Sequence, residues 1–163
     1  MRLKGSVMTH DTSTALLDVD GHADEGAEST PSVITASLVP EDRRMQFLPS
    51  KFGLVGMLRV EMSIYAWMQR LCPAYNGGHW NFIELSNDGG YMVPTGADTF
   101  DMSVDGNGFE GQVSADTAGL IATIFALNAL IWQGLDKLND KYEQLLEYIG
   151  HHPDHLVIRR AID

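Results

Sequence analysis

Short alternating patterns in the middle of the chain predict a small antiparallel sheet. Every second side chain from residue 100 to 104 is apolar, which is the period of a strand with one buried face. Two segments rich in Gly, Asn and Asp, at 87–90 and 105–108, separate such runs with residues that favour hairpin turns. The pattern therefore predicts three to four antiparallel strands within about residues 79–113.

Helical periodicity borders this sheet on both sides. Residues 54–72 gather apolar side chains on one broad face, and residues 136–149 carry them as a narrower stripe. Residues 118–132 are apolar almost all round, which is typical of a helix at the centre of a core. These segments predict an α+β fold of a single domain, in which four or five helices pack with the sheet.

Two shorter helices complete this prediction. Pro40 suits the first turn of a helix, and we expect Pro49 to end that helix. Pro153 begins a second short helix later in the sequence. The first short helix carries Arg43 and Arg44, which are either solvated, in contact with a partner, or part of a buried ion pair.

Glu61 interrupts the apolar face of the helix predicted at residues 54–72. At 100° per residue its side chain falls among apolar positions, Leu54 and Leu58 included, that we expect to be buried. A carboxylate there must be paired, hydrogen-bonded or protonated, because burying it alone costs several kcal/mol. Arg43, Arg44 and a tyrosine hydroxyl are candidate partners. A structural role for Glu61 therefore competes with a functional one.

The composition restricts the class of protein. A chain of 163 residues with 44% apolar content has room for one core, and its formal net charge of −11 argues against a basic surface for nucleic acid. We therefore expect no direct nucleic-acid binding. Because the single cysteine, Cys72, cannot form an internal disulfide and no apolar run is long enough for a membrane span, we expect a cytoplasmic protein without a membrane segment.

The negative charge is concentrated near the N-terminus. Residues 1–42 hold 8 acidic and 2 basic side chains, so the remaining 121 residues carry only −5 of the net charge. Residues 1–32 show neither a helical nor a strand period. We predict a flexible acidic tail at 1–32 and a folded domain at 33–163.

Motifs for metal or phosphate binding are weak in this sequence. The cluster His151–His155 offers metal ligands, but Pro153 interrupts its helical register and no HExxH pattern is present. The acidic run that starts at Asp101 has Gln112 where a calcium loop requires a bidentate Glu. Residues 106–111 match GxGxxG, but they span a hairpin turn instead of opening a helix. We expect no cofactor.

An enzyme is not expected either, because no serine lies in a GxSxG elbow and Cys72 faces the apolar side of its helix. The alternative is a small metal-dependent hydrolase that uses Glu61, Asp105 and the His151–His155 cluster. Bound zinc or manganese would distinguish this alternative from a protein that acts by binding alone.

Several blocks of sequence resemble the plasmid-borne antirestriction family of the ArdB/KlcA type. They read ASLVPEDRRMQFLPSKFG (36–53), GGHWNFIELSNDGGYMVP (77–94), VDGNGFEGQVSADTAGLIATIFALN (104–128) and the closing AID. The resemblance implies a small α+β protein of mobile elements, without a catalytic site, that protects incoming DNA from the host's type I restriction-modification system. That system is then the expected partner.

Candidate partner-binding residues come from two sources. The resemblance supplies positions that match the family pattern, and an aromatic residue on an open sheet face is a natural interface anchor. Together they are Arg43, Arg44, Glu61, Trp80, Tyr91, Asp105 and Asp163. Because a DNA mimic needs carboxylates spaced like phosphates along an extended surface, we expect recognition through a protein surface instead of DNA mimicry.

Overall fold

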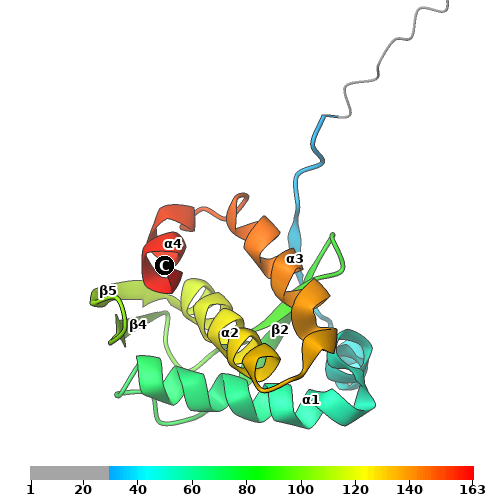
Figure 1. The fold of residues 1–163 in the computed structure, drawn as a ribbon, viewed down its shortest axis with the longest axis horizontal. Coiled ribbons are helices and arrows are strands. Elements are labelled where there is room, and N and C mark those ends of the chain that lie inside the picture. The colour runs from blue at the N-terminus through cyan, green and yellow to red at the C-terminus, as the bar shows by residue number, and fades with distance from the viewer. Residues whose placement is uncertain (1–29) are drawn as a thin grey trace, which may run out of the picture. The chain divides into compact units, whose positions relative to one another are not determined.

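The computed structural model describes residues 30–163, and residues 32–163 form one compact unit. The flexible tail predicted at 1–32 lies almost entirely outside the described residues and stays a prediction. The α+β class and the single folded domain are confirmed (Figure 1).

The predicted strands are present, but they belong to two antiparallel sheets. Strands β2 (Trp80–Leu85) and β3 (Gly90–Pro94) pair in one sheet, and β4 (Thr99–Val104) and β5 (Phe109–Ser114) form a separate pair. The first sheet gains an edge strand, β1 (Ala36–Leu38), which the sequence analysis did not predict. Proline at the end of β3 donates no backbone hydrogen bond, which fits the break between the two sheets there.

Helix α1 (Arg44–Leu71) follows a short 3-10 turn, η1 (Glu41–Arg43), and is kinked at Gly53. Gly53 has φ 74° and ψ 155°, a conformation that essentially only glycine adopts. The prediction that Pro49 ends the first helix was wrong, because the helix continues through Pro49 to this kink. Proline removes a single helical hydrogen bond, and Met45, whose carbonyl would have accepted it, is 92% exposed to solvent.

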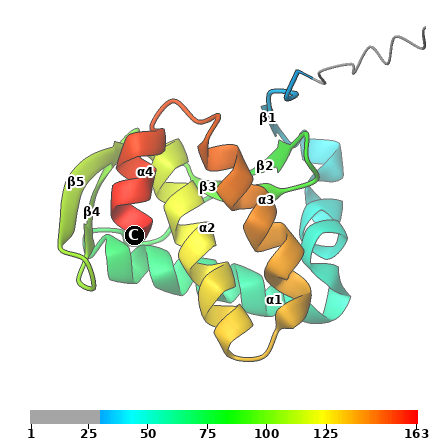
Figure 2. The same cartoon turned by 45° about the horizontal axis from the view of Figure 1, so that its top comes forward.

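Helix α2 (Ala115–Trp132) lies at the centre of the fold, with α1, α3 (Asn139–Ile149) and α4 (His155–Ile162) around it (Figure 2). Ser114 caps its N-terminus, since its Oγ accepts a hydrogen bond from the Thr117 backbone at 3.1 Å. Among the described residues it alone has the length and mean hydropathy of a membrane span, but most of it is buried in the core. The predicted core helix is therefore confirmed.

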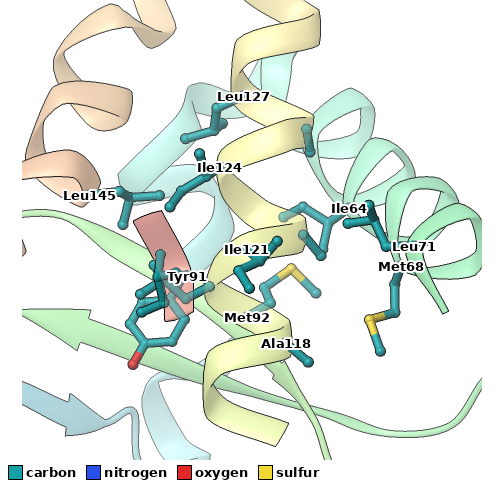
Figure 3. Packing of buried hydrophobic residues seen from close by; sticks show 14 of the residues in the cluster. Ile64, Met68, Leu71, Tyr91, Met92, Ala118, Ile121, Ile124, Leu127 and Leu145 are labelled. Carbon is teal, nitrogen blue, oxygen red and sulfur yellow. The ribbon is translucent and has the colours of Figure 1, made fainter. Parts of the chain in front are cut away.

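Close packing between α2 and β3 depends on Gly119. A Cβ atom at this position would lie 2.1 Å from the backbone oxygen of Met92, closer than any real Cβ contact. The Thr123 hydroxyl accepts a hydrogen bond from the Met92 backbone at 3.4 Å, which joins α2 to β3, and donates to the Gly119 carbonyl within α2 at 2.8 Å. The core then continues on both sides of α2, with Ile64 and Met68 from α1 and Leu145 from α3 (Figure 3).

The apolar stripe predicted at 136–149 is confirmed, because Leu138, Leu145 and Ile149 are buried. The stripe begins in a 3-10 turn, η2 (Asp136–Leu138), and continues into α3. The short helix predicted after Pro153 is present as α4 and extends to Ile162.

Two lysines hold the turn between β2 and β3 against the helices. Lys51 Nζ lies 2.9 Å from Asp88 Oδ1 and 3.0 Å from Glu84 Oε1, and Lys141 of α3 lies 2.6 Å from Asp88 Oδ2. The Lys51 side chain is only 4% exposed, so its charge depends on these carboxylates. Hydrogen bonds from Lys141 and Lys51 lower the pKa of Asp88 to about 2.

The predicted core face of α1 is partly wrong. Leu54 and Leu58 are 77% and 59% exposed, whereas Val60 and Ile64 are completely buried. The buried residues occupy a neighbouring sector of the helix, and the apolar arc seen in the sequence is wider than the area that the domain covers. An apolar part of α1 therefore faces solvent.

Candidate interaction surface

Both halves of α1 border a shallow, open pocket beside β2. This elbow pocket is lined by Arg44, Met45, Leu48, Pro49, Met57, Leu58, Glu61 and Phe82, and its volume is about 260 Å³. The kink at Gly53 brings residues 44–49 and residues 57–61 to the same hollow. The pocket combines an apolar lining with one basic and one acidic side chain.

The Arg44 side chain packs against β2 instead of extending into solvent. Its Nη2 donates to the Trp80 carbonyl at 2.7 Å, and its guanidinium carbon lies 4.6 Å from the centre of the Phe82 ring. Nε is 3.5 Å from Glu41 Oε2, and the side chain is 16% exposed. Of the alternatives for the basic pair, Arg44 is thus largely buried and paired.

Arg43 differs from its neighbour. Its side chain is 54% exposed, and Nη1 lies 3.4 Å from Glu84 Oε2. An ion pair this exposed contributes at most about 1 kcal/mol to stability. The guanidinium therefore remains accessible from outside the domain.

Glu61 is hydrogen-bonded to Tyr65, as one of the predicted alternatives required. The Tyr65 hydroxyl donates to Glu61 Oε1 at 2.9 Å, and burial together with this carboxylate raises the pKa of Tyr65. The ring of Tyr65 also packs 5.4 Å from that of Trp80. Glu61 Oε2 has no protein partner within residues 30–163. Arg44, Glu61 and Trp80, which are distant in sequence, therefore belong to one cluster.

Trp80 and Tyr91 are not surface anchors, which corrects the interpretation of both as open-face aromatics. Trp80 is 3% exposed and its Nε1 donates to the Tyr75 hydroxyl at 2.6 Å. Tyr91 is completely buried, and its hydroxyl donates to Asp116 Oδ1 at 2.8 Å. Trp80 packs against Tyr65 of α1, and Tyr91 packs against Tyr148 of α3, so these aromatics act in the core.

Asp116 joins Tyr91 to the loop before α4. His152 is 4% exposed, and its Nδ1 accepts a hydrogen bond from the Asp154 backbone at 2.9 Å. The ring hydrogen must then be on Nε2, which donates to Asp116 Oδ2 at 2.7 Å. Burial alone raises the pKa of Asp116, but the hydrogen bonds from His152 and Tyr91 outweigh it and leave that pKa below its usual value.

The metal-dependent hydrolase is not supported. No group of three His, Cys, Asp or Glu side chains suited to a metal ion occurs in the part of the chain that the structure describes. His152 uses both ring nitrogens within the fold, while Glu61 lies in the elbow pocket and Asp105 in the turn after β4. The three proposed parts of such a site therefore have separate structural settings.

Asp105 and Asp163 are exposed and lie toward the same corner of the domain. Asn107, in the turn after β4, donates to the backbone oxygens of Arg160 and Ala161 at 3.2 and 3.0 Å. The end of α4 is consequently next to the β4–β5 turn in both ribbon views (Figures 1 and 2). Both carboxylates remain candidates for partner contact.

An exposed apolar stripe on α1 was not predicted from the sequence. It consists of Leu54, Val55, Leu58 and Met62, which are between 59% and 96% exposed. The stripe leads from the elbow pocket, through Leu58, to a second hollow of about 540 Å³ between residues 52–56 and 134–138. The signal was present, because Val55 and Met62 extend the apolar arc beyond what one buried face needs.

The fold and the sequence identify the family. The profile of the family described as "Antirestriction protein" matches residues 73–163. The chain is similar to two antirestriction proteins KlcA of Escherichia coli. One is 45% identical over 135 residues, with 80% of this chain and 95% of the relative covered. The other is 46% identical over 140 residues, with 82% and 96% covered. The chain belongs to the antirestriction protein family of the ArdB/KlcA type.

A solved structure supports the same assignment. It is 45% identical and superposes with a TM-score of 0.75, covering 81% of this chain and 96% of its own. The solved structure is described as one of the KlcA and ArdB proteins, which show a novel fold and antirestriction activity against type I DNA restriction systems in vivo but not in vitro. The family comprises inhibitors that are not enzymes, which confirms the prediction of a non-enzymatic protein.

Proposed function

We propose that this protein acts in the cytoplasm on behalf of a mobile element, where it counters a type I restriction-modification system by recognising a protein component. Membership of the antirestriction family carries this proposal, together with the type I activity described for KlcA and ArdB. The accessible elbow pocket and apolar stripe supply a surface suited to protein recognition.

Charge spacing argues against extended DNA mimicry. Among the described residues, an exposed row of carboxylates follows η2 and α3 and consists of Asp136, Asp140, Glu143 and Glu147. Such a row covers roughly 16 Å of helix, over which duplex DNA carries about ten phosphates. Lys137 and Lys141 lie within the same segment and reduce its charge further. Four carboxylates over this length make a poor copy of a DNA backbone.

The difference between activity in cells and in vitro supports a target that operates before DNA cleavage. KlcA and ArdB are active in vivo but not in vitro. An inhibitor that occupied the DNA-binding groove of the restriction complex should act on the purified complex as well. Recognition of a subunit that is accessible only in the cell, or of a cellular state of the system, accounts for both results.

A challenge with unmodified phage tests the proposal. Cells that carry a type I system and express the full chain should plate the phage at least tenfold better than cells without it. A chain lacking residues 1–32 should protect equally well, because the described surface lies outside that segment. Loss of protection by the shortened chain, with its circular dichroism unchanged, would show that the acidic tail is required and contradict surface recognition by the folded domain.

A further inference from the structure

We propose that the elbow pocket and the adjoining apolar stripe bind an amphipathic helix of the restriction component. The inference rests on the proposed function and names the surface that performs it. Five large apolar side chains of α1 (Met45 and the four stripe residues) are each more than half exposed. A concentration of this kind on one element is unusual for a surface that contacts only water.

The spacing of the stripe fits a helix as occupant. Leu54, Leu58 and Met62 are four residues apart and form one ridge along α1. Ridges of this type pack into the grooves of a second helix, and this ridge is about 12 Å long. An occupant of two to three turns would cover it. The elbow pocket and the second hollow would then each receive one large side chain from the occupant.

The charges beside the stripe define which charges the occupant carries on each of its two flanks. At 100° per residue, Arg59 lies on one flank of Leu58 and Glu61 on the other. Arg59 donates a hydrogen bond to the neutral Gln133 side chain at 3.3 Å and forms no ion pair among the residues that the structure describes. Glu61 retains one carboxylate oxygen without a protein partner in the same part of the chain. The complementary helix has a basic side chain facing Glu61 and an acidic one facing Arg59.

Two of the exposed positions provide the decisive variant. Val55→Asp with Met62→Asp places charges at side chains that are 96% and 69% exposed, so folding should be unaffected. Leu156→Asp in α4 is the matched control, because Leu156 is 67% exposed but belongs to another element. Each full-length chain is expressed with a type I system under active restriction. The restriction subunits that co-purify are measured by immunoblot, and phage plating is measured in parallel.

The double variant should lower both subunit capture and phage protection at least tenfold, whereas Leu156→Asp should resemble the wild type. Arg59→Glu and Glu61→Lys should each lower subunit capture several-fold, because each places a side chain opposite a like charge of the proposed helix. Normal capture and protection by a folded double variant would overturn the proposed surface. Capture at the wild-type level by both charge variants would overturn the charge arrangement proposed for the occupant.

A second copy of this chain is the remaining occupant to test. Sedimentation analysis of the wild type should show a monomer at micromolar concentration. A dimer that the double variant dissolves would assign the stripe to a second copy of the chain and overturn the proposal. If the wild type neither protects cells nor captures a subunit, the proposed function itself fails, and that result does not depend on any variant.

Discussion

His152 Nε2 lies 2.7 Å from Asp116 Oδ2, and this contact fastens the loop before α4 to the first turn of α2. The same carboxylate accepts a hydrogen bond from Tyr91 of β3. One side chain therefore connects a strand, the central helix and the C-terminal part of the fold. Because Asp116 is partly buried and bonded on both oxygens, its removal leaves two polar groups without their acceptor.

Asp116→Asn should lower the free energy of unfolding by about 1–3 kcal/mol. Asparagine keeps one acceptor oxygen, which His152 can use, but its amide nitrogen cannot accept from the Tyr91 hydroxyl, and both bonds lose their charged acceptor. Urea denaturation followed by circular dichroism measures the change. Asp140→Asn is the control, since Asp140 is exposed on α3 and should differ from the wild type by less than about 0.5 kcal/mol. Equal midpoints for both variants would refute the role of Asp116.

Asp88 should make the domain sensitive to acid. Its pKa of about 2 in the folded chain is below the usual value of 3.8, so its contribution to stability is present above pH 4. That contribution is lost as the pH falls from about 4 toward 2, because protonation releases Lys51 and Lys141. Asp116, whose pKa is also depressed, acts in the same direction.

The Asp88→Asn variant separates the contribution of this turn. Asparagine tolerates the positive φ of 68° at this position but cannot carry the charge. Its unfolding free energy should therefore fall less steeply between pH 4 and pH 2 than that of the wild type. Urea midpoints measured at each pH make the comparison, and parallel curves would show that the lysines do not depend on Asp88.

Gly53→Ala should destabilise the domain by roughly 1–3 kcal/mol, because alanine is strained at φ 74° and ψ 155°. Gly56→Ala is a matched control three residues away in the same helix. Gly56 has an ordinary helical conformation and space for a methyl group, so this change should stabilise by about 0.5–1 kcal/mol. Thermal unfolding distinguishes the two. A neutral Gly53→Ala would mean that the kink is not required.

Trp80→Phe should destabilise the fold by about 1–3 kcal/mol, because it removes the hydrogen bond to Tyr75 and leaves a gap in the core. Trp132→Phe, at a side chain that is 85% exposed, should change stability by less than about 0.5 kcal/mol. Urea denaturation of the two variants compares a buried and an exposed tryptophan. Normal stability of Trp80→Phe would reopen an interface role for Trp80.

The regular elements were predictable from local patterns. The helix around residues 118–132 is apolar enough to be assigned to the core without knowledge of its neighbours. The alternation along β4 likewise fixed both its strand character and its buried face. These features depend on residues that are close in sequence, and the structure confirms them.

Other features depend on how distant segments meet. Nothing local places Tyr91 beside Asp116 and His152, so the buried network was not predictable. Apolar character alone did not reveal that Leu58 is exposed, because the size of the covered area depends on the rest of the domain. The helix end predicted at Pro49 was wrong for a different reason. The backbone carbonyl that loses its hydrogen bond there is in an exposed turn, so the helix can continue.

The burial of Cys72 gives a direct route to labelling the protein. It is the single cysteine of the chain and is only 1% exposed, so its thiol is shielded from reagents in the native state. A cysteine introduced at Val55 would then be the reactive one, without any need to replace Cys72. A photoreactive crosslinker attached there inside restricting cells would mark whichever protein approaches α1.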